Sequence, residues 1–97
     1  SMTVTVPGAS EHQIGLALDI VSMTYSGLEI GFGETVAGRW LKEHCDEYGF
    51  ILRYPEGKEY ITGIQYEPWH FRYVGKEAAV QIMERDITLE EFIEELE

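Results

Sequence analysis

The sequence lacks the features that mark several large classes of protein. It contains one cysteine, Cys45, so no disulfide can form within the chain. Only 7 of the 97 residues are lysine or arginine, against 18 aspartate or glutamate, which gives a formal net charge of −11. Nucleic acids and anionic membrane surfaces attract proteins with a cationic face. The composition therefore argues against both of these partners.

Long apolar runs are also missing. No segment approaches the roughly 20 apolar residues that a membrane-spanning helix needs, and the first residues have neither the basic nor the apolar region of a signal peptide. We therefore expect no membrane span and no signal peptide within this chain. Hydrophobic residues make up 44% and charged residues 26%, which is ordinary for a globular protein. Because a chain this short has a thin core, a bound metal would help to stabilise it.

The spacing of apolar residues predicts helices and strands in a single α+β domain. We expect strands at 14–21, 50–54 and 70–74, helices at 35–48 and 76–84 and after residue 88, and an extended stretch at 60–66. Gly49 stands where a left-handed residue ends a helix, and Thr88 and Glu91 have the spacing of a capping box. This order predicts a small, mostly antiparallel sheet with flanking helices.

The first predicted helix carries three residues that need an interpretation. Trp40 lies on its apolar side and is predicted to be a core residue. His44 is predicted to be a core or edge histidine rather than a metal ligand. Cys45 is predicted to be a small buried apolar residue, because no neighbouring feature marks it as an activated thiol.

The chain has three histidines, and two of them stand near carboxylates. His12 precedes the strand that carries Asp19, and His70 follows Glu67 by three residues. Two imidazoles and one carboxylate are a common ligand set for catalytic zinc, with water in the fourth position. Zinc lowers the pKa of such a water toward about 7, and Glu67 would take its proton.

A simpler interpretation of the same residues is that they are scattered surface groups. Asp19 favours the metal, because it interrupts an apolar strand. An unpaired buried charge costs several kcal/mol, so a carboxylate in such a strand needs a partner or a metal.

Two motifs carry a family resemblance. The first is Ser10-x-His12-x-x-Gly15-x-Ala17-x-Asp19, and the second is Glu67-Pro68-Trp69-His70-x-Arg72-Tyr73-Val74-Gly75. In this order and separation they resemble the two signatures of the zinc-dependent D-alanyl-D-alanine carboxypeptidases of the VanY type, with the related L,D-carboxypeptidases and D,D-dipeptidases. The resemblance implies a D-Ala-D-Ala carboxypeptidase or hedgehog-like zinc peptidase fold, with its N-terminal part missing. Residues 1–97 would then be a single truncated zinc carboxypeptidase domain.

The resemblance also implies a metal site and a reaction. His12, Asp19 and His70 would bind Zn²⁺, and Glu67 would be the general base and later the proton donor. The reaction would be hydrolysis of the peptide bond before a C-terminal D-amino acid, D-alanine, in peptidoglycan stem peptides. Whether the bond is D,D or L,D stays open. The implied location is the bacterial cell envelope, outside the cytoplasmic membrane.

Three further residues are candidates for binding the substrate. Ser10 stands where the family has a serine near the substrate. Trp69 either packs against the zinc ligands or lines the substrate cleft. Arg72 shares a strand face with His70, because residues i and i+2 point the same way. Either Arg72 or Arg53 could bind the substrate carboxylate.

Two other functions remain open from the sequence. One is a non-catalytic, truncated zinc-binding module that binds cell-wall peptide without turnover, and the other is an acidic interaction domain without a metal. If part of the family's domain is missing, surface that it covers is exposed. We therefore expect the chain to self-associate as a homo-oligomer.

Overall fold

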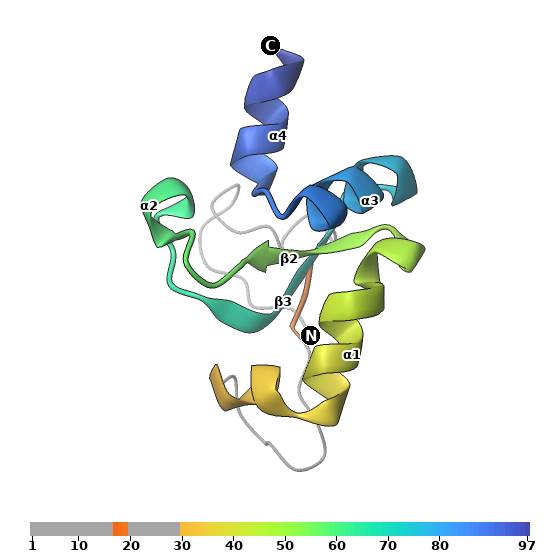
Figure 1. The fold of residues 1–97 in the computed structure, drawn as a ribbon, viewed down its shortest axis with the longest axis vertical. Coiled ribbons are helices and arrows are strands. Elements are labelled where there is room, and N and C mark those ends of the chain that lie inside the picture. The colour runs from red at the N-terminus through yellow and green to blue at the C-terminus, as the bar shows by residue number, and fades with distance from the viewer. Residues whose placement is uncertain (1–16, 20–29) are drawn as a thin grey trace.

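The described part of the chain forms a three-stranded antiparallel sheet with helices packed on both faces (Figure 1). The structure is a computed structural model, and it describes residues 17–19 and 30–97. The strands are β1 (Ala17–Asp19), β2 (Phe50–Tyr54) and β3 (Glu67–Tyr73). The helices are α1 (Val36–His44), α2 (Glu59–Thr62), α3 (Lys76–Arg85) and α4 (Leu89–Leu96), with 3-10 helices η2 (Ile30–Glu34) and η3 (Cys45–Tyr48). The α+β prediction with an antiparallel sheet is confirmed.

The sheet order is β1-β3-β2, so β3 is the central strand. In β2, Leu52 is paired with Phe71, and Ile51 is paired with Arg72. Directly opposed residues of an antiparallel pair lie on the same face of the sheet, and successive residues alternate. Leu52 and Phe71 therefore belong to one face, and Ile51 and Arg72 belong to the other.

Each face of the sheet has its own core cluster. On the first face, Leu52 and Phe71 pack with Cys45 at the junction of α1 and η3. On the second face, Ile51 packs with residues of α3 and α4, namely Ala79, Ile82 and Leu89. Alternating side chains of β2 thus contact different helices. Leu52 packs at the junction of α1 and η3, and Ile51 packs against α3 and α4.

The predicted helix ends are borne out where a local hydrogen bond defines them. Thr88 accepts a hydrogen bond from the backbone N–H of Glu91, and the Glu91 side chain accepts one from the backbone N–H of Thr88. This is the predicted capping box. Gly49 has φ 87° and caps η3, as predicted. These features need only residues that are close in sequence, which is why the pattern reveals them.

Three predictions about residues 35–66 need correction. The predicted helix at 35–48 is α-helical only to His44 and continues as the 3-10 helix η3. Residues 59–62 form α2 rather than an extended segment, because the carbonyl of Lys58 accepts two backbone hydrogen bonds and closes a helical turn. Trp40 is not a core residue: it is 46% exposed, and its ring stacks on His44 with centroids 4.4 Å apart.

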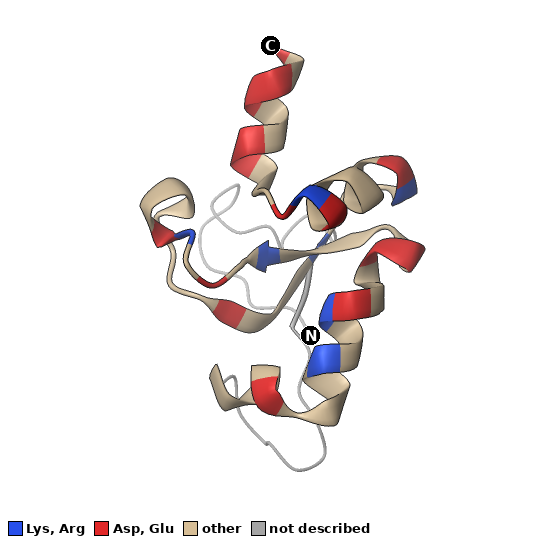
Figure 2. Cartoon of the chain, in the orientation of Figure 1, with Lys and Arg blue, Asp and Glu red and all other residues tan. Residues whose placement is uncertain are grey.

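The C-terminal helix α4 stands away from the rest of the molecule (Figure 1). Its first residue, Leu89, is buried, whereas Ile93 and Leu96 are exposed. Red ribbon segments mark the glutamate positions along α4 (Figure 2). Within residues 17–19 and 30–97, no helix is long and apolar enough to span a membrane. Self-association through such exposed apolar residues stays a prediction.

Candidate active site

The pairing of β1 with β3 brings two of the predicted ligand positions together. Asp19 is the direct partner of His70 in this antiparallel pair. Opposed positions share a face of the sheet, with Cβ atoms about 4.5–5.5 Å apart as a rule. Ser10 and His12 lie outside the described residues. Among the described side chains, no group of three or more His, Cys, Asp and Glu could hold a metal, so a complete ligand set would need a residue from outside them.

An irregularity in β3 brings Glu67 to His70. Residues three apart on a regular strand point to opposite faces. Here the register between β2 and β3 shifts between the Leu52–Phe71 pair and the Tyr54–Glu67 pair, so β3 holds two more residues than β2 over this interval. Such bulges re-aim side chains next to active sites. As a result, Glu67 Oε1 lies 3.5 Å from His70 Nδ1.

Pro68 explains where this irregularity falls. A proline cannot donate a hydrogen bond to a neighbouring strand, so within sheets it is confined to edges, strand starts and bulges. Pro68 is buried in the central strand, within the interval where the register shifts. The sequence prediction began this strand at residue 70, whereas the strand begins at Glu67.

The ring of His70 is enclosed. Its side chain is 9% exposed, whereas that of Glu67 is 27% exposed. The ring of Tyr54 packs edge-on against it, with centroids 5.0 Å apart and an interplanar angle of 63°. The histidine is therefore fixed by its neighbours, and the carboxylate beside it still reaches solvent. This combination suits a histidine ligand next to an acid that exchanges protons with water.

The two candidate anchors for a substrate carboxylate differ in their surroundings. Arg72 shares the face of His70, as predicted. The terminal nitrogens of Arg53 donate two hydrogen bonds to Glu90, at 2.9 and 2.8 Å. This ion pair engages the guanidinium of Arg53. Which arginine binds the substrate stays a prediction, and Arg72 is favoured by its place on the face of His70. Trp69 is half-buried, and its role stays a prediction.

Sequence reasoning missed Tyr54 and Glu90. Tyr54 is an ordinary tyrosine at the end of a predicted strand, and Glu90 belongs to an acidic run that is typical of a solvated helix face. Residues 53 and 90 are 37 positions apart, so no local spacing connects them. One signal was available: an arginine inside an otherwise apolar strand needs a partner, as Asp19 does.

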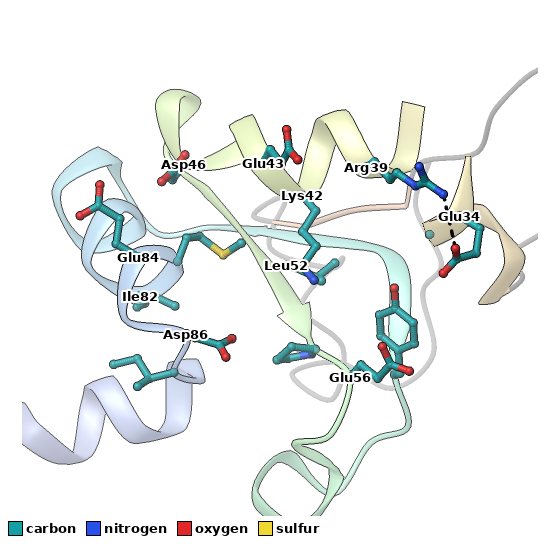
Figure 3. A pocket seen from close by; sticks show the side chains of 15 residues that line it. Glu34, Arg39, Lys42, Glu43, Asp46, Leu52, Glu56, Ile82, Glu84 and Asp86 are labelled. Carbon is teal, nitrogen blue, oxygen red and sulfur yellow. Dashed lines mark ion pairs between the residues drawn. The ribbon is translucent and has the colours of Figure 1, made fainter. Parts of the chain in front are cut away.

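A pocket of about 670 Å³ lies elsewhere, between α1 and α3 (Figure 3). Leu52 belongs to its lining, and this residue is on the face opposite to His70. Its carboxylates are Glu34, Glu43, Asp46, Glu56, Glu84 and Asp86, and Arg39 pairs with Glu34 at 3.6 Å. Among the residues that the structure describes, its lining includes neither His70 nor Glu67. Among the described residues, this pocket is therefore separate from His70 and Glu67.

Two further ionisable groups are unsuited to proton transfer near neutral pH. Burial, with the charge of Asp46, raises the pKa of the Cys45 thiol to about 12. Burial also raises the pKa of Tyr66, with smaller contributions from Glu56 and Glu34. Cys45 is 4% exposed, which confirms it as a buried apolar residue.

Curated proteins with similar sequences include two carboxypeptidases. The putative carboxypeptidase YodJ of Bacillus subtilis (strain 168) is 53% identical over 95 residues, which are 96% of this chain and 34% of that protein. A D-alanyl-D-alanine carboxypeptidase of Enterococcus faecalis is 49% identical over 90 residues, 93% of this chain and 32% of that protein. The chain thus spans about a third of the length of these relatives.

Solved structures share the fold. The LdcB LD-carboxypeptidase, reported to reveal the molecular basis of peptidoglycan recognition, has a TM-score of 0.86 and 53% identity, over 94% of this chain and 43% of that one. VanYB in complex with D-alanine-D-alanine has a TM-score of 0.75 and 48% identity, over 94% and 48%. A mutant of the vancomycin resistance D,D-pentapeptidase VanY in complex with Zn(II) has a TM-score of 0.74 and 49% identity, over 93% and 48%.

The family match covers most of the chain. Residues 1–76 match the family described as VanY, D-alanyl-D-alanine carboxypeptidase. This stretch includes both motifs, the three predicted ligands and Glu67. By this match and by the similarity of its fold, the chain belongs to the VanY D-alanyl-D-alanine carboxypeptidase family.

Proposed function

We propose that this chain belongs to a zinc-dependent peptidase that removes a C-terminal D-alanine from peptidoglycan stem peptides, and that residues 1–97 act within a single zinc carboxypeptidase domain. The observation that supports this most is the pairing of Asp19 with His70, with Glu67 3.5 Å from the histidine. The relatives include both D-alanyl-D-alanine and L,D-carboxypeptidases. The scissile bond is therefore D,D or L,D.

The residues suit a zinc ion. His12, Asp19 and His70 would hold it, because two imidazoles and a carboxylate are a common ligand set for catalytic zinc. The opposed positions of Asp19 and His70 fit this assignment. Zinc, when bound, would polarise the scissile carbonyl and lower the pKa of a water toward about 7.

Glu67 is the proposed proton carrier. Its carboxylate is partly exposed beside the enclosed His70. From there it would accept a proton from the attacking water and deliver it to the leaving amine. Arg72 would attract the terminal carboxylate of the substrate from the same face of the sheet. Ser10 and Trp69 stay proposals as further substrate contacts. The proposed location of this activity is the bacterial cell envelope, outside the cytoplasmic membrane, which the cell-wall substrate supports.

The experiment measures release of D-alanine from two peptides, one ending in D-Ala-D-Ala and one in which the terminal D-alanine follows an L-residue. The Zn(II)-loaded protein is expected to release D-alanine, and a chelator should stop the reaction. Glu67→Gln should lower the rate by about 10²–10⁴-fold, because it removes the general base. Full activity in Glu67→Gln would remove the role assigned to this residue.

Glu47→Gln is the matched control. Glu47 pairs with His44 three residues away, as Glu67 does with His70. It differs in its position, because it lies on the surface of the 3-10 helix η3. This variant is expected to keep the wild-type rate. A similar loss in both variants would show that the assay reports general damage instead of the loss of a base.

A second candidate is a module that binds cell-wall peptide without cleaving it. A solved relative, VanYB, is in complex with D-alanine-D-alanine, which supports binding of such a peptide end by this fold. This candidate predicts saturable binding of the D-Ala-D-Ala peptide by the Zn(II)-loaded protein with no D-alanine released. Turnover would exclude it.

A further inference from the structure

Arg53 and Glu90 form a partly enclosed ion pair between β2 and α4. The two terminal nitrogens of Arg53 donate to the two carboxylate oxygens of Glu90 at 2.9 and 2.8 Å. The side chain of Arg53 is 10% exposed. Two parallel charge-assisted hydrogen bonds fix both the position and the plane of a guanidinium. The orientation of Arg53 is therefore set by a residue on α4.

The guanidinium of Arg53 is connected to the candidate active site through the ring of Tyr54. Its central carbon lies 4.7 Å from the centroid of the Tyr54 ring, within the range of a cation–π contact. The same Tyr54 ring packs edge-on against His70, 5.0 Å away. The contacts thus run without a break from Glu90, through Arg53 and Tyr54, to the proposed metal ligand.

Such contacts matter for a metal ligand because its ring must be held in one orientation. Outer partners that fix a ligating histidine affect metal affinity and activity by about 10–100-fold when they are removed. His70 lies next to the irregular part of β3, where the regular sheet contacts are interrupted. Packing against Tyr54 helps to hold the ring there.

A second ion pair on α4 provides a matched comparison. Arg85 of α3 donates two hydrogen bonds to Glu95, at 3.0 and 2.5 Å, so the geometry is again bidentate. The side chains of Arg85 and Glu95 are 45% and 48% exposed. This pair also links α4 to the body of the molecule, but at α3 instead of β2.

From these contacts we propose that Glu90 is a positioning residue for His70, acting through Arg53 and Tyr54. The proposal rests on the proposed function, in which His70 is a metal ligand. It gives the C-terminal helix a part in the site, although α4 follows the stretch that matches the family.

The test compares Glu90→Gln with Glu95→Gln in the whole chain. Zn(II) affinity is measured by competition with a chromogenic chelator, and the ligand geometry is monitored by the visible absorption spectrum of the Co(II)-loaded protein. Glu90→Gln is expected to weaken Zn(II) binding about tenfold and to change the Co(II) spectrum. Glu95→Gln should leave both at their wild-type values. A Glu90→Gln variant with wild-type affinity and spectrum would overturn the proposal.

A second variant separates positioning from stability. Glu90→Gln leaves a buried guanidinium without its carboxylate, so it can also destabilise the fold. The double variant Arg53→Met with Glu90→Leu replaces both charges by apolar groups, which keeps stability nearer to that of the wild type. It still removes the cation over Tyr54, so the weaker Zn(II) binding and the altered Co(II) spectrum should persist. Wild-type affinity and spectrum in this variant would contradict the proposal even if Glu90→Gln does not fold.

Failure of the two proposals gives different results. If the wild-type protein binds neither Zn(II) nor Co(II), the proposed function is wrong, and this inference falls with it. If the wild-type protein binds both ions and the Glu90 variants match it, only the inference is wrong.

Discussion

The chain holds two histidine–glutamate pairs with the same spacing, and they have opposite characters. In the first, His44 Nδ1 lies 2.7 Å from Glu47 Oε2, and the two side chains are 34% and 57% exposed. In the second, His70 Nδ1 lies 3.5 Å from Glu67 Oε1, and the exposures are 9% and 27%. The shorter contact thus belongs to the more exposed pair, which makes a short distance alone a poor marker of a functional site.

The two pairs arise in different ways. Residues 44 and 47 come together within the helical segment formed by α1 and η3, where side chains three apart are neighbours. Residues 67 and 70 come together because β3 is irregular, and the position opposite His70 is Asp19. Each histidine ring also contacts an aromatic ring. What distinguishes His70 is therefore its burial and the presence of a second acidic residue, Asp19, at the paired position of β1.

Both histidines also stand beside the same core cluster. Cys45 follows His44, Phe71 follows His70, and these two apolar residues pack together with Leu52. The backbone next to each histidine is thus anchored in one cluster, although the side chain of His70 lies on the opposite face of the sheet. Four predictions test this comparison.

The largest expected effect concerns the shared core. Phe71 is 1% exposed, so Phe71→Ala should lower the free energy of unfolding by about 3–5 kcal/mol. His70→Ala, measured without metal, should cost clearly less, because the histidine is proposed to serve chemistry rather than stability. Urea unfolding followed by circular dichroism measures both. Equal losses would show that the two positions contribute alike to the core.

The second prediction concerns Cys45. Its pKa is raised from 9.0 to about 12, so at pH 8 the folded protein holds roughly a thousandfold less thiolate than the unfolded chain. Alkylation by iodoacetamide, followed by mass spectrometry, should be slower in the folded protein by at least about this factor. Similar rates with and without urea would contradict the buried position of the thiol.

The same shift predicts a dependence of stability on pH. Because the folded pKa lies above the unfolded value, the contribution of the protonated thiol is complete below about pH 9. It is lost as the pH rises from 9 toward 12. A Cys45→Ala variant should therefore show a shallower decline of stability across this alkaline range.

The third prediction compares the two histidines as ligands. His70→Ala should weaken Zn(II) binding by more than about a hundredfold, beyond what the loss of an outer partner causes. His44→Ala should leave the affinity unchanged, since His44 pairs with Glu47 at the surface. Isothermal titration with Zn(II) measures both variants. An effect of His44→Ala as large as that of His70→Ala would place the metal elsewhere.

The smallest effect is expected at the surface pair. Glu47→Gln should change the free energy of unfolding by less than about 0.5 kcal/mol, because exposed ion pairs contribute little. Raising the salt concentration should reduce even this difference. A loss above about 1 kcal/mol in urea unfolding would show that this pair is more than a surface contact.

Local patterns predicted much of the fold. The strand at 50–54, the capping box of Thr88 and Glu91 and the left-handed Gly49 all depend on neighbours in sequence. The pattern failed at α2, which is a single closed turn of four residues with too few apolar positions to show a period. It also failed at Trp40, because helical spacing identifies a face of the helix without saying whether another element covers it.

Some residues of the candidate site could likewise be predicted from the sequence, and others could not. Two motifs were sufficient to propose the ligands and Glu67, and the family match agrees with the resemblance on which those roles rest. The motifs gave no indication of Tyr54 or Glu90, because an ordinary tyrosine and one acid in an acidic run carry no distinctive pattern. Ser10 and His12 lie outside the described residues, so their part in the site stays a prediction.

The sequence by itself determined the kinds of chemical group available and the local turns, since helix caps and strand alternation depend on interactions between near neighbours. Tertiary structure decided which groups meet. The pairing of Asp19 with His70, the shifted register that brings Glu67 to the histidine, and the contact between β2 and α4 all join segments through sheet register and packing. Register depends on the summed burial of whole strands, and no short motif specifies it.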